Sequence, residues 1–384
     1  MRILVAPDSY KGCRTASQVA ALMKKGIESG YPEAIVETVP LADGGEGTLD
    51  TLVDATGGKV MEVEVTGPNM ARVASKYGVL GDQQTAVIEV AQAAGLTLVP
   101  QSARNPLQAT TLGVGELLIA ALDEGYRQFI IGLGGSATND GGLGMLQALG
   151  GVFADENGQQ VLSIALSLAS IRSVDLTGVD PRIKESQITV ACDVDNPLCG
   201  PRGASAVFGP QKGASLEQVE VLDASLHAYA SLIEHHTGRS AQSIPGAGAA
   251  GGLGFAFLML GAELVPGAKI MAEASGLERK LRVADWVITG EGRSDSQTMY
   301  GKLPVYVAQQ AKELGVKAIL ISGGLGQGYE DLYAYFVSCH SIVSGPMSLE
   351  SAMEHAEVLL MRTSENVARL IQAASGNRRE AECL

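Results

Sequence analysis

The feature that most constrains the fold is a repeated change of pattern, in which a short apolar run ends in a polar, glycine-rich stretch. Short apolar runs bounded in this way are typical of buried strands, and helical periodicity between them indicates a parallel sheet with crossover helices. In open α/β sheets the carboxyl ends of the strands line the ligand crevice. We therefore expect six such stretches to form a binding site: residues 7–12 (PDSYKG), 42–47 (ADGGEG), 132–142 (GLGGSATNDGG), 193–197 (DVDNP), 290–295 (GEGRSD) and 323–328 (GGLGQG).

Strand and helix alternate simply at the two ends of the chain but not in its middle. Residues 2–6 and 34–41 are predicted strands on either side of a helix from Thr15 to Gly30, and the last hundred residues alternate in the same way. From residue 59 a period-two pattern predicts a partly antiparallel lobe. We expect an α/β fold whose Rossmann-like, doubly wound parallel-sheet domain is discontinuous. Residues 1–62 and 278–384 form it, a second, mixed α/β domain of residues 63–277 is inserted, and the active site lies in the cleft between them.

Charge and composition exclude several classes of protein. The net charge is −14 and the pI is near 4.9, whereas a nucleic-acid surface needs dense lysine and arginine. No stretch approaches the ~18 uninterrupted apolar residues of a membrane span, so we expect a cytoplasmic protein without a membrane partner. The five cysteines form no C-x-x-C and the five histidines no H-E-x-x-H, which argues against a disulfide framework and against zinc.

Residues 132–137 match the G-x-G-x-x-A fingerprint of a dinucleotide-binding turn. Asp155 lies at a distance suited to binding a ribose, which favours an NAD-dependent dehydrogenase of a small hydroxy acid. Against this, residues 138–142 extend the loop where the fingerprint needs a helix, and no Walker motif is present. The residues alone predict a phosphate-binding α/β enzyme and favour a kinase over a dehydrogenase. A non-catalytic protein that binds a small anion is the third alternative.

The predicted strand ends also carry many carboxylates, too many for a site that binds only an anion. An excess of acids beside phosphate-binding loops indicates Mg²⁺ and a base for an alcohol. The plainer interpretation is that each aspartate after a strand caps a helix or forms an Asx turn. For the loop 246–254 (GAGAAGGLG), close packing through small residues is as good an interpretation as ligand binding.

Six long motifs resemble those of the bacterial type 1 glycerate kinases, and the resemblance spans essentially the whole chain. It implies ATP-dependent phosphorylation of D-glycerate with Mg²⁺, giving 2-phosphoglycerate rather than 3-phosphoglycerate, and a monomer or homodimer that takes only small-molecule substrates. It also implies a Rossmann-like domain with an inserted α/β domain. The motifs are APDSYKG (6–12), VPLADGGEGT (39–48), GLGGSATNDGGLGMLQALG (132–150), ACDVDNPLCGPRGASAVFGPQKGAS (191–215), PGAGAAGGLG (245–254) and VITGEGRSDSQTMYGKLP (287–304).

The chemistry of phosphoryl transfer then suggests a role for each candidate residue. Asp193, or else Asp8, would accept the proton of the substrate hydroxyl. Lys11 and Arg293 would bind the transferring phosphoryl group or the glycerate carboxylate, with Lys212 as a weaker alternative. The residues expected to bind the nucleotide are Gly134, Gly135, Ser136, Asn139, Asp140, Glu291 and Lys212, and those expected to bind Mg²⁺ are Asp43, Glu46 and Asp195.

Overall fold

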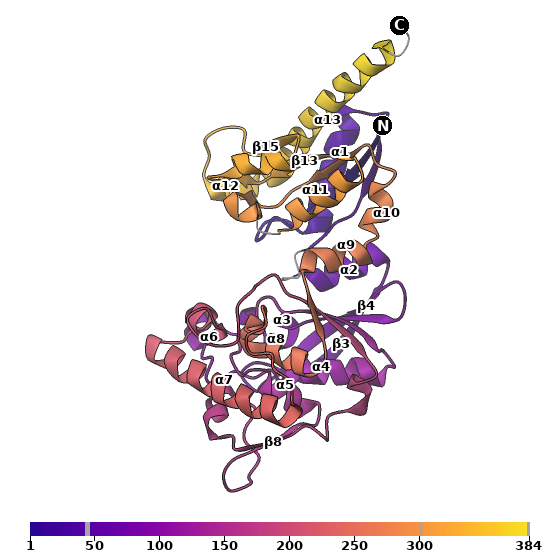
Figure 1. The fold of residues 1–384 in the computed structure, drawn as a ribbon. Helices are drawn as coiled ribbons and strands as arrows, with labels where there is room; N and C mark the ends of the chain where they lie inside the picture. The colour runs from indigo at the N-terminus through magenta and orange to yellow at the C-terminus, as the bar shows by residue number, and fades with distance from the viewer. Residues whose placement is uncertain (43–46, 300–301, 382–384) are drawn as a thin grey trace. The chain divides into compact units, whose positions relative to one another are not determined.

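The computed structural model describes residues 1–42, 47–299 and 302–381, and the chain divides into two compact units (Figure 1). Unit 1 comprises Met1–Asp43 and Ala268–Leu384, and unit 2 comprises Gly44–Gly267. Each unit has a hydrophobic core of its own. Unit 1 is therefore discontinuous along the chain, because unit 2 is inserted between its two segments.

Unit 1 is built on a five-stranded parallel sheet with the order β15-β13-β11-β1-β2. In chain order this arrangement is 2-1-3-4-5, the flavodoxin-like form of a doubly wound sheet, which confirms the α/β prediction. The three central strands are almost fully buried, as expected when helices cover both faces of a parallel sheet. The strands are β1 (Arg2–Val5), β2 (Ile35–Thr38), β11 (Trp286–Thr289), β13 (Lys317–Ser322) and β15 (Ser338–Ser341).

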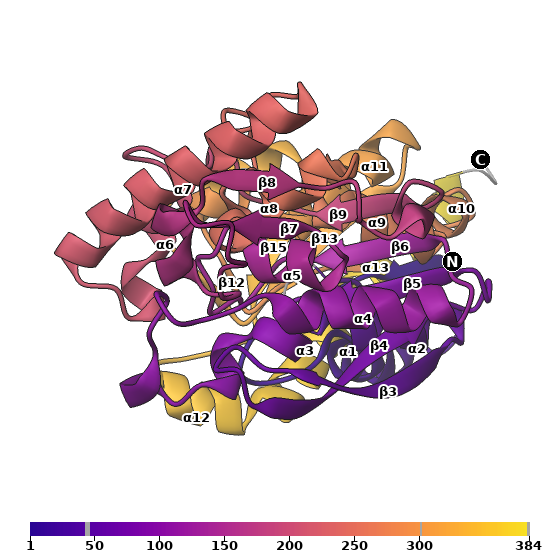
Figure 2. The same ribbon diagram turned by 90° about the horizontal axis from the view of Figure 1, so that it is seen from below.

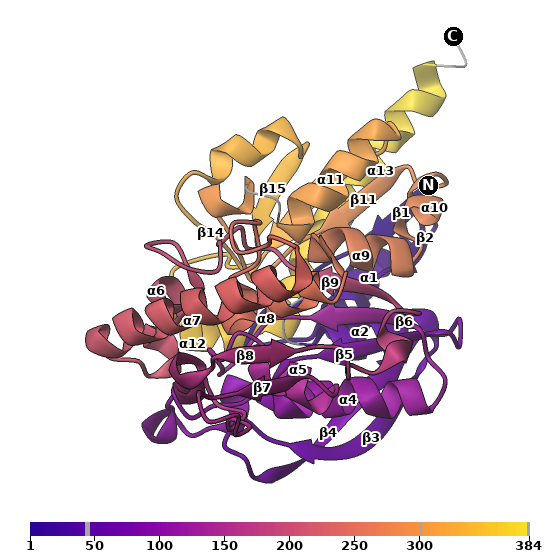
Figure 3. The same ribbon diagram turned by 60° about the horizontal axis from the view of Figure 1, so that its bottom comes forward.

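Helices cover both faces of this sheet. α1 (Ala16–Gly30) lies along α13 (Ala356–Ala381), and both pack on the face that carries Ile3, Val5 and Ile288 (Figure 1). α11 (Leu303–Glu313) packs on β11 and β13 (Figure 3). The predicted α1 is found where expected, because the Thr15 side chain and Gln18 form a capping box at its start. The other elements of unit 1 are α10 (Leu277–Leu281), β12 (Arg293–Ser294), β14 (Gly324–Leu325) and α12 (Leu349–Glu354), and α9 (Gly267–Ala274) begins at the last residue of unit 2.

Unit 2 contains a six-stranded mixed sheet with the order β10-β9-β6-β5-β4-β3. The pairs β3–β4 and β4–β5 are antiparallel, and the pairs from β5 to β10 are parallel. This confirms the partly antiparallel lobe that the sequence predicts from residue 59. The strands are β3 (Lys59–Thr66), β4 (Arg72–Val79), β5 (Thr85–Glu89), β6 (Gln128–Gly132), β9 (Gln187–Ala191) and β10 (Glu263–Val265), and β7 (Val152–Ala154) pairs antiparallel with β8 (Ser173–Asp175) in a separate two-stranded sheet.

Helices pack against this sheet, and α4 lies beside β3, β4 and β5 (Figure 2). α2 packs on β4 and β5, and its Leu49 N–H donates to the Glu89 carboxylate at 3.0 Å. Residues 47–62, which the sequence analysis places with the first domain, thus pack within unit 2. The helices are α2 (Thr48–Thr56), α3 (Ala91–Ala94), α4 (Leu112–Asp123), α5 (Leu143–Ala148), α6 (Ala204–Phe208), α7 (Leu216–Thr237) and α8 (Ala249–Met259). No helix in the described part of the chain is both long and apolar enough to cross a membrane.

Candidate functional site

A cavity of about 740 Å³ lies at the carboxyl ends of the strands of unit 1. The segments that follow β1, β11, β13 and β15 all contribute to its wall. Its wall carries the cations Lys11, Arg293 and Lys302 and also apolar side chains such as Ile342 and Met353. Three of the six glycine-rich strand ends predicted from the sequence therefore meet at one cavity.

Glu291 is a buried acidic residue of this cavity. The residue is 8% exposed, and its Oε1 accepts hydrogen bonds from the Ser294 hydroxyl (3.0 Å) and the Thr298 hydroxyl (2.7 Å). Its Oε2 lies 3.4 Å from the Lys302 Nζ. The Ser294 hydroxyl also shares a hydrogen bond with Ser322 at the end of β13. These contacts hold the carboxylate and Lys302 in fixed positions at the strand ends.

Three more of the predicted site residues in unit 1 are Asp8, Lys11 and Arg293. Asp8 is buried at the end of β1, where its backbone N–H donates to the Gly290 carbonyl and its Oδ1 accepts from the Ser9 N–H at 2.6 Å. Lys11 and Arg293 are exposed, and the Arg293 Nε lies 3.6 Å from the Asp295 carboxylate. Unit 1 therefore brings Lys11, Arg293 and Glu291 to one cavity and places Asp8 beside it.

The predicted phosphate turn, Gly134 to Ser136, lies in unit 2. Gly135 has a φ of +74°, the left-handed conformation that glycine adopts most easily. The turn is bound to the end of α3, because the Leu96 N–H donates to the Gly135 carbonyl and the Ala137 N–H donates to Ala94, both at 2.8 Å. The binding of nucleotide phosphates by this turn stays a prediction.

Asp140 is fully buried at the start of α5. Its carboxylate accepts hydrogen bonds from the N–H and hydroxyl of Thr111 (2.9 and 2.7 Å) and from the N–H groups of Gly142 (3.1 Å) and Gly144 (3.2 Å). Burial raises the pKa of Asp140, and these hydrogen bonds oppose the rise. The carboxylate thus joins the starts of α4 and α5, which is the capping role that the plainer interpretation assigns to such residues.

Lys212 is also buried, and it forms hydrogen bonds with the segment that contains the predicted phosphate turn. Its ammonium group donates to the Ser136 hydroxyl (2.9 Å) and to the Thr138 carbonyl (2.7 Å). Burial lowers the pKa of Lys212 to about 7, although the negative charge of Asp140 opposes this change. The neighbouring Asn139 is fully buried, and its amide donates to Ser205 at 2.9 Å. The turn of unit 2 is therefore held by buried polar contacts.

The loop 246–252 packs directly against this segment. Ala250, Gly251 and Gly252 all have left-handed backbone angles, and the Gly251 carbonyl accepts from the Gly141 N–H at 3.0 Å. A Cβ on Gly251 would lie only 2.0 Å from the Thr138 carbonyl oxygen. Close packing of two backbones thus explains the small residues of this loop.

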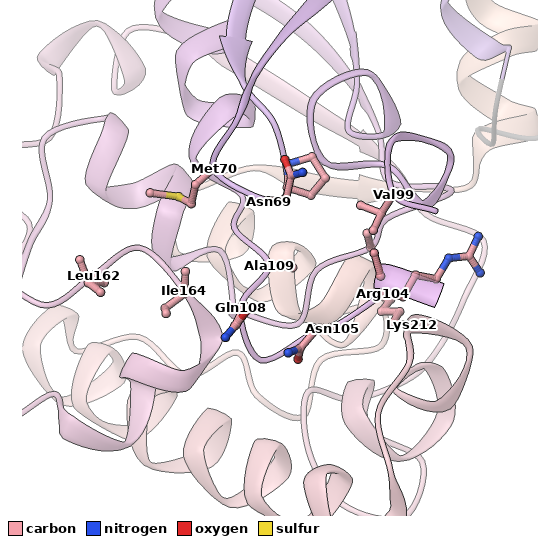
Figure 4. A pocket seen from close by; sticks show the side chains of 13 residues that line it. Asn69, Met70, Val99, Arg104, Asn105, Gln108, Ala109, Leu162, Ile164 and Lys212 are labelled. Atoms are coloured by element: carbon pink, nitrogen blue, oxygen red, sulfur yellow. The ribbon is translucent and has the colours of Figure 1, made fainter. Parts of the chain in front are cut away.

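A second cavity, of about 300 Å³, lies in unit 2. In the view of Figure 4, Leu162 and Ile164 lie on one side of it, and Arg104 and Lys212 lie on the other. The Lys212 Nζ donates hydrogen bonds to the Ser136 hydroxyl and to the Thr138 carbonyl. This cavity therefore offers a less distinct arrangement of charges than the cavity of unit 1.

Asp193 follows β9, as the sequence predicts. Its Oδ1 accepts a hydrogen bond from the N–H of Gly267, the first residue of α9, at 2.9 Å. This contact fixes the carboxylate and also fits the alternative role as a helix cap. The role of Asp193 as a base stays a prediction.

Of the three predicted Mg²⁺ ligands, the structure describes only Asp195. Asp43 and Glu46 lie outside the described residues. Asp195 is exposed, and the bond that it accepts from Arg202 at 2.7 Å lowers its pKa. No cluster of three or more His, Cys, Asp or Glu suited to a metal occurs within residues 1–42, 47–299 and 302–381.

Lys302 and the apolar side chains of the unit 1 cavity are not among the residues that the sequence predicts for the site. Gly301 and Lys302 do not match the Walker motif, and the plain interpretation of Lys302 is a solvated charge. Residues such as Ile342 and Met353 belong to no motif, so only the fold brings them to the cavity. The shared cleft expected from the sequence stays a prediction.

Comparison with known proteins decides the family. The model of the glycerate kinase family matches residues 3–372. The chain belongs to the glycerate kinase family. A protein named glycerate kinase from Halalkalibacterium halodurans is 48% identical, covering 95% of this chain and 97% of its own length. A protein named glycerate 2-kinase from Escherichia coli is 44% identical over 96% of this chain and 97% of its own length.

A solved structure supports the same assignment. The crystal structure of a putative glycerate kinase 2 from Salmonella typhimurium has a TM-score of 0.89 and 44% sequence identity, covering 98% of this chain and 99% of that one. This glycerate kinase family member is thus a phosphotransferase with an alcohol group as acceptor, and it uses ATP and Mg²⁺. Membership of this family decides against the two alternatives, an NAD-dependent dehydrogenase and a non-catalytic protein that binds a small anion.

Proposed function

We propose that this chain phosphorylates D-glycerate at its 2-hydroxyl group and forms 2-phosphoglycerate. The name of the relative from Escherichia coli, glycerate 2-kinase, supports the 2-position. We also propose that the protein acts in the cytoplasm on small molecules, as a monomer or homodimer.

The structural observation that carries this proposal is the group of three cations, Lys11, Arg293 and Lys302, at one cavity. Phosphoryl transfer depends mainly on positioning and on neutralisation of the phosphate charge. Lys11 and Arg293 are exposed and line the cavity, so they are suited to contact the transferring phosphoryl group. Glu291 holds Lys302 through an ion pair, which keeps a third positive charge at the same place.

In the proposed reaction the 2-hydroxyl oxygen of glycerate attacks the γ-phosphorus of ATP. A bond forms between these two atoms, and the bond from the γ-phosphorus to the oxygen bridging the β- and γ-phosphates breaks, so that ADP leaves. The hydroxyl proton passes to a carboxylate, for which we propose Asp193, with Asp8 as the alternative. When Mg²⁺ is bound, it neutralises charge on the phosphate oxygens, and Asp43, Glu46 and Asp195 stay its proposed ligands.

Replacement of Asp193 by asparagine tests the proposed base. The asparagine side chain keeps an oxygen that can accept from the Gly267 N–H, so the local fold should persist. Loss of a general base usually costs about 10² to 10⁴ in rate. We therefore expect kcat to fall by this factor in Asp193→Asn while the affinity for ADP stays close to that of the wild type. If kcat is nearly normal in Asp193→Asn and falls only in Asp8→Asn, Asp193 is a helix cap and Asp8 is the base.

The identity of the product tests the proposed position of transfer. Enolase consumes 2-phosphoglycerate directly, but it consumes 3-phosphoglycerate only after a mutase has converted it. We expect D-glycerate, ATP, the protein and enolase to form phosphoenolpyruvate, seen as absorbance at 240 nm, without added mutase. L-Glycerate serves as the control substrate. A signal that depends on the mutase would show that the 3-hydroxyl is the acceptor instead.

A further inference from the structure

We propose that the cavity of unit 1 is the nucleotide site, with adenine against its apolar side chains and the phosphates at its cations. The proposal rests on the proposed function only in requiring ATP as the donor, and it does not depend on which hydroxyl group is phosphorylated. It places the nucleotide in unit 1, whereas the fingerprint at residues 132–137 would place it in unit 2.

The topology of unit 1 creates a crevice at this point. From β1 the chain crosses to β2 on one side, and from β11 it crosses to β13 on the other, so the direction of winding reverses between β1 and β11. Ligands of doubly wound sheets bind at such a switch point, beyond the carboxyl ends of the strands. Lys11 follows β1 and Arg293 follows β11, and both line the cavity. The sheet of unit 2 has no equivalent point, since β5, β6, β9 and β10 are neighbours in chain order.

The wall of the cavity combines cationic and apolar side chains, as a nucleotide requires. Lys11, Arg293 and Lys302 offer positive charge for phosphates. Ile342 and Met353 are apolar members of the wall, which suit the faces of a purine ring. At about 740 Å³ the cavity is far larger than a three-carbon acid needs, and glycerate has no apolar ring to place against such a wall.

Apolar side chains at the cavity are also left exposed to solvent. Leu349 is 77% exposed and Met347 is 39% exposed, and both line the cavity. A bound base would cover apolar surface here, and the flexible methionine side chain adapts readily to a planar ring. The cavity of unit 2 also carries exposed apolar side chains, but at about 300 Å³ it is smaller, and its buried lysine, Lys212, already donates to Ser136 and Thr138.

Photolabelling of the full-length protein with 8-azido-ADP locates the base directly. The reactive group lies on the purine, so the labelled peptide identifies the residues that contact it. We expect the label within residues 338–356 and expect unmodified ADP to prevent it. A label within residues 132–144 would overturn the proposal. Protection of residues 338–356 by D-glycerate alone would also overturn it, because the cavity would then bind the acid.

A charge among the apolar side chains of the cavity provides a second test. Leu349→Glu places a carboxylate where the base would lie, and because Leu349 is mostly exposed the fold should tolerate it. Leu370→Glu is the matched control, since Leu370 is 65% exposed in the same unit but does not line the cavity. By calorimetry without glycerate, we expect Leu349→Glu to weaken ADP binding at least about tenfold, and Leu370→Glu to leave it unchanged. Equal affinities in both variants would contradict the proposal. This binding assay needs no turnover, so it is independent of the test of the product.

Discussion

Replacement of Lys212 by methionine should change how the stability of unit 2 depends on pH. Methionine is close in length to lysine and carries no charge, so Lys212→Met removes the buried ammonium group while largely filling its space. The loss of the hydrogen bonds to Ser136 and Thr138 adds a cost of about 1–3 kcal/mol, which does not depend on the titration of the lysine. The informative quantity is therefore the slope of stability against pH.

The sign and size of this slope follow from the pKa of Lys212, which burial lowers from 10.5 to about 7. Above the unfolded pKa the amine is neutral in both states and contributes nothing. As the pH falls toward 7, only the unfolded state gains a proton, so the folded state loses relative stability, and below pH 7 the loss is constant. Each pH unit within this window corresponds to about 1.4 kcal/mol, and the full loss is about 5 kcal/mol.

Urea unfolding at pH 7, 8 and 9, followed by far-UV circular dichroism, measures this effect. We expect the free energy of unfolding of the wild type, minus that of Lys212→Met, to rise by about 2–3 kcal/mol between pH 7 and 9. Lys184→Met is the control, because Lys184 is an exposed lysine of the same unit, and its difference from the wild type should stay flat. A flat difference for Lys212→Met would show that the buried amine keeps its proton throughout, and would refute the reasoning.

Two further predictions concern stability. Gly251→Ala places a Cβ 2.0 Å from the Thr138 oxygen at a φ of +69°, so we expect a loss of about 2–5 kcal/mol. In Gly158→Ala the φ is similar, at +75°, but the space is open, so only about 1–2 kcal/mol should be lost, and equal melting temperatures for the two variants would contradict this account. Ser215→Ala removes the capping box that Ser215 and Gln218 form at the start of α7, which should cost about 1 kcal/mol in urea unfolding. Ser215→Gly should cost only a few tenths of a kcal/mol, and an alanine variant as stable as the glycine variant would show that the cap is unimportant.

Local patterns in the sequence predict the elements of this fold well. The apolar spacing and the Thr15 cap are sufficient to locate α1, and the period-two alternation after residue 59 is sufficient to indicate β3 and β4. The kink in α8 at residues 250–252 is harder to predict, because it depends on contact with residues 138–141 from another part of the chain. Local patterns thus predict which elements exist but not which distant segments they meet.

The same limit applies to the site. The glycine-rich strand ends include Lys11, Glu291 and Arg293, which line one cavity because parallel strands share a carboxyl edge, and their roles stay a prediction. The fingerprint at residues 132–137 does not reveal that Asp140 is buried and bonded to Thr111, because nothing in a motif reports burial. Nor does any motif indicate the apolar side chains of the cavity, which only the packing of the C-terminal segment brings there.

The insertion of unit 2 between the segments of unit 1 has a consequence for synthesis on the ribosome. β1 pairs with β2 early in the chain, but its other neighbour, β11, begins only at Trp286. At about 5–20 residues per second, roughly 12–50 s pass between the synthesis of β2 and that of β11. During this interval one edge of β1 has no strand to pair with, while unit 2 is continuous and is synthesised completely. The nascent chain therefore carries an unfinished sheet edge beside a complete unit, and this interval is when a chaperone would have most effect on its yield.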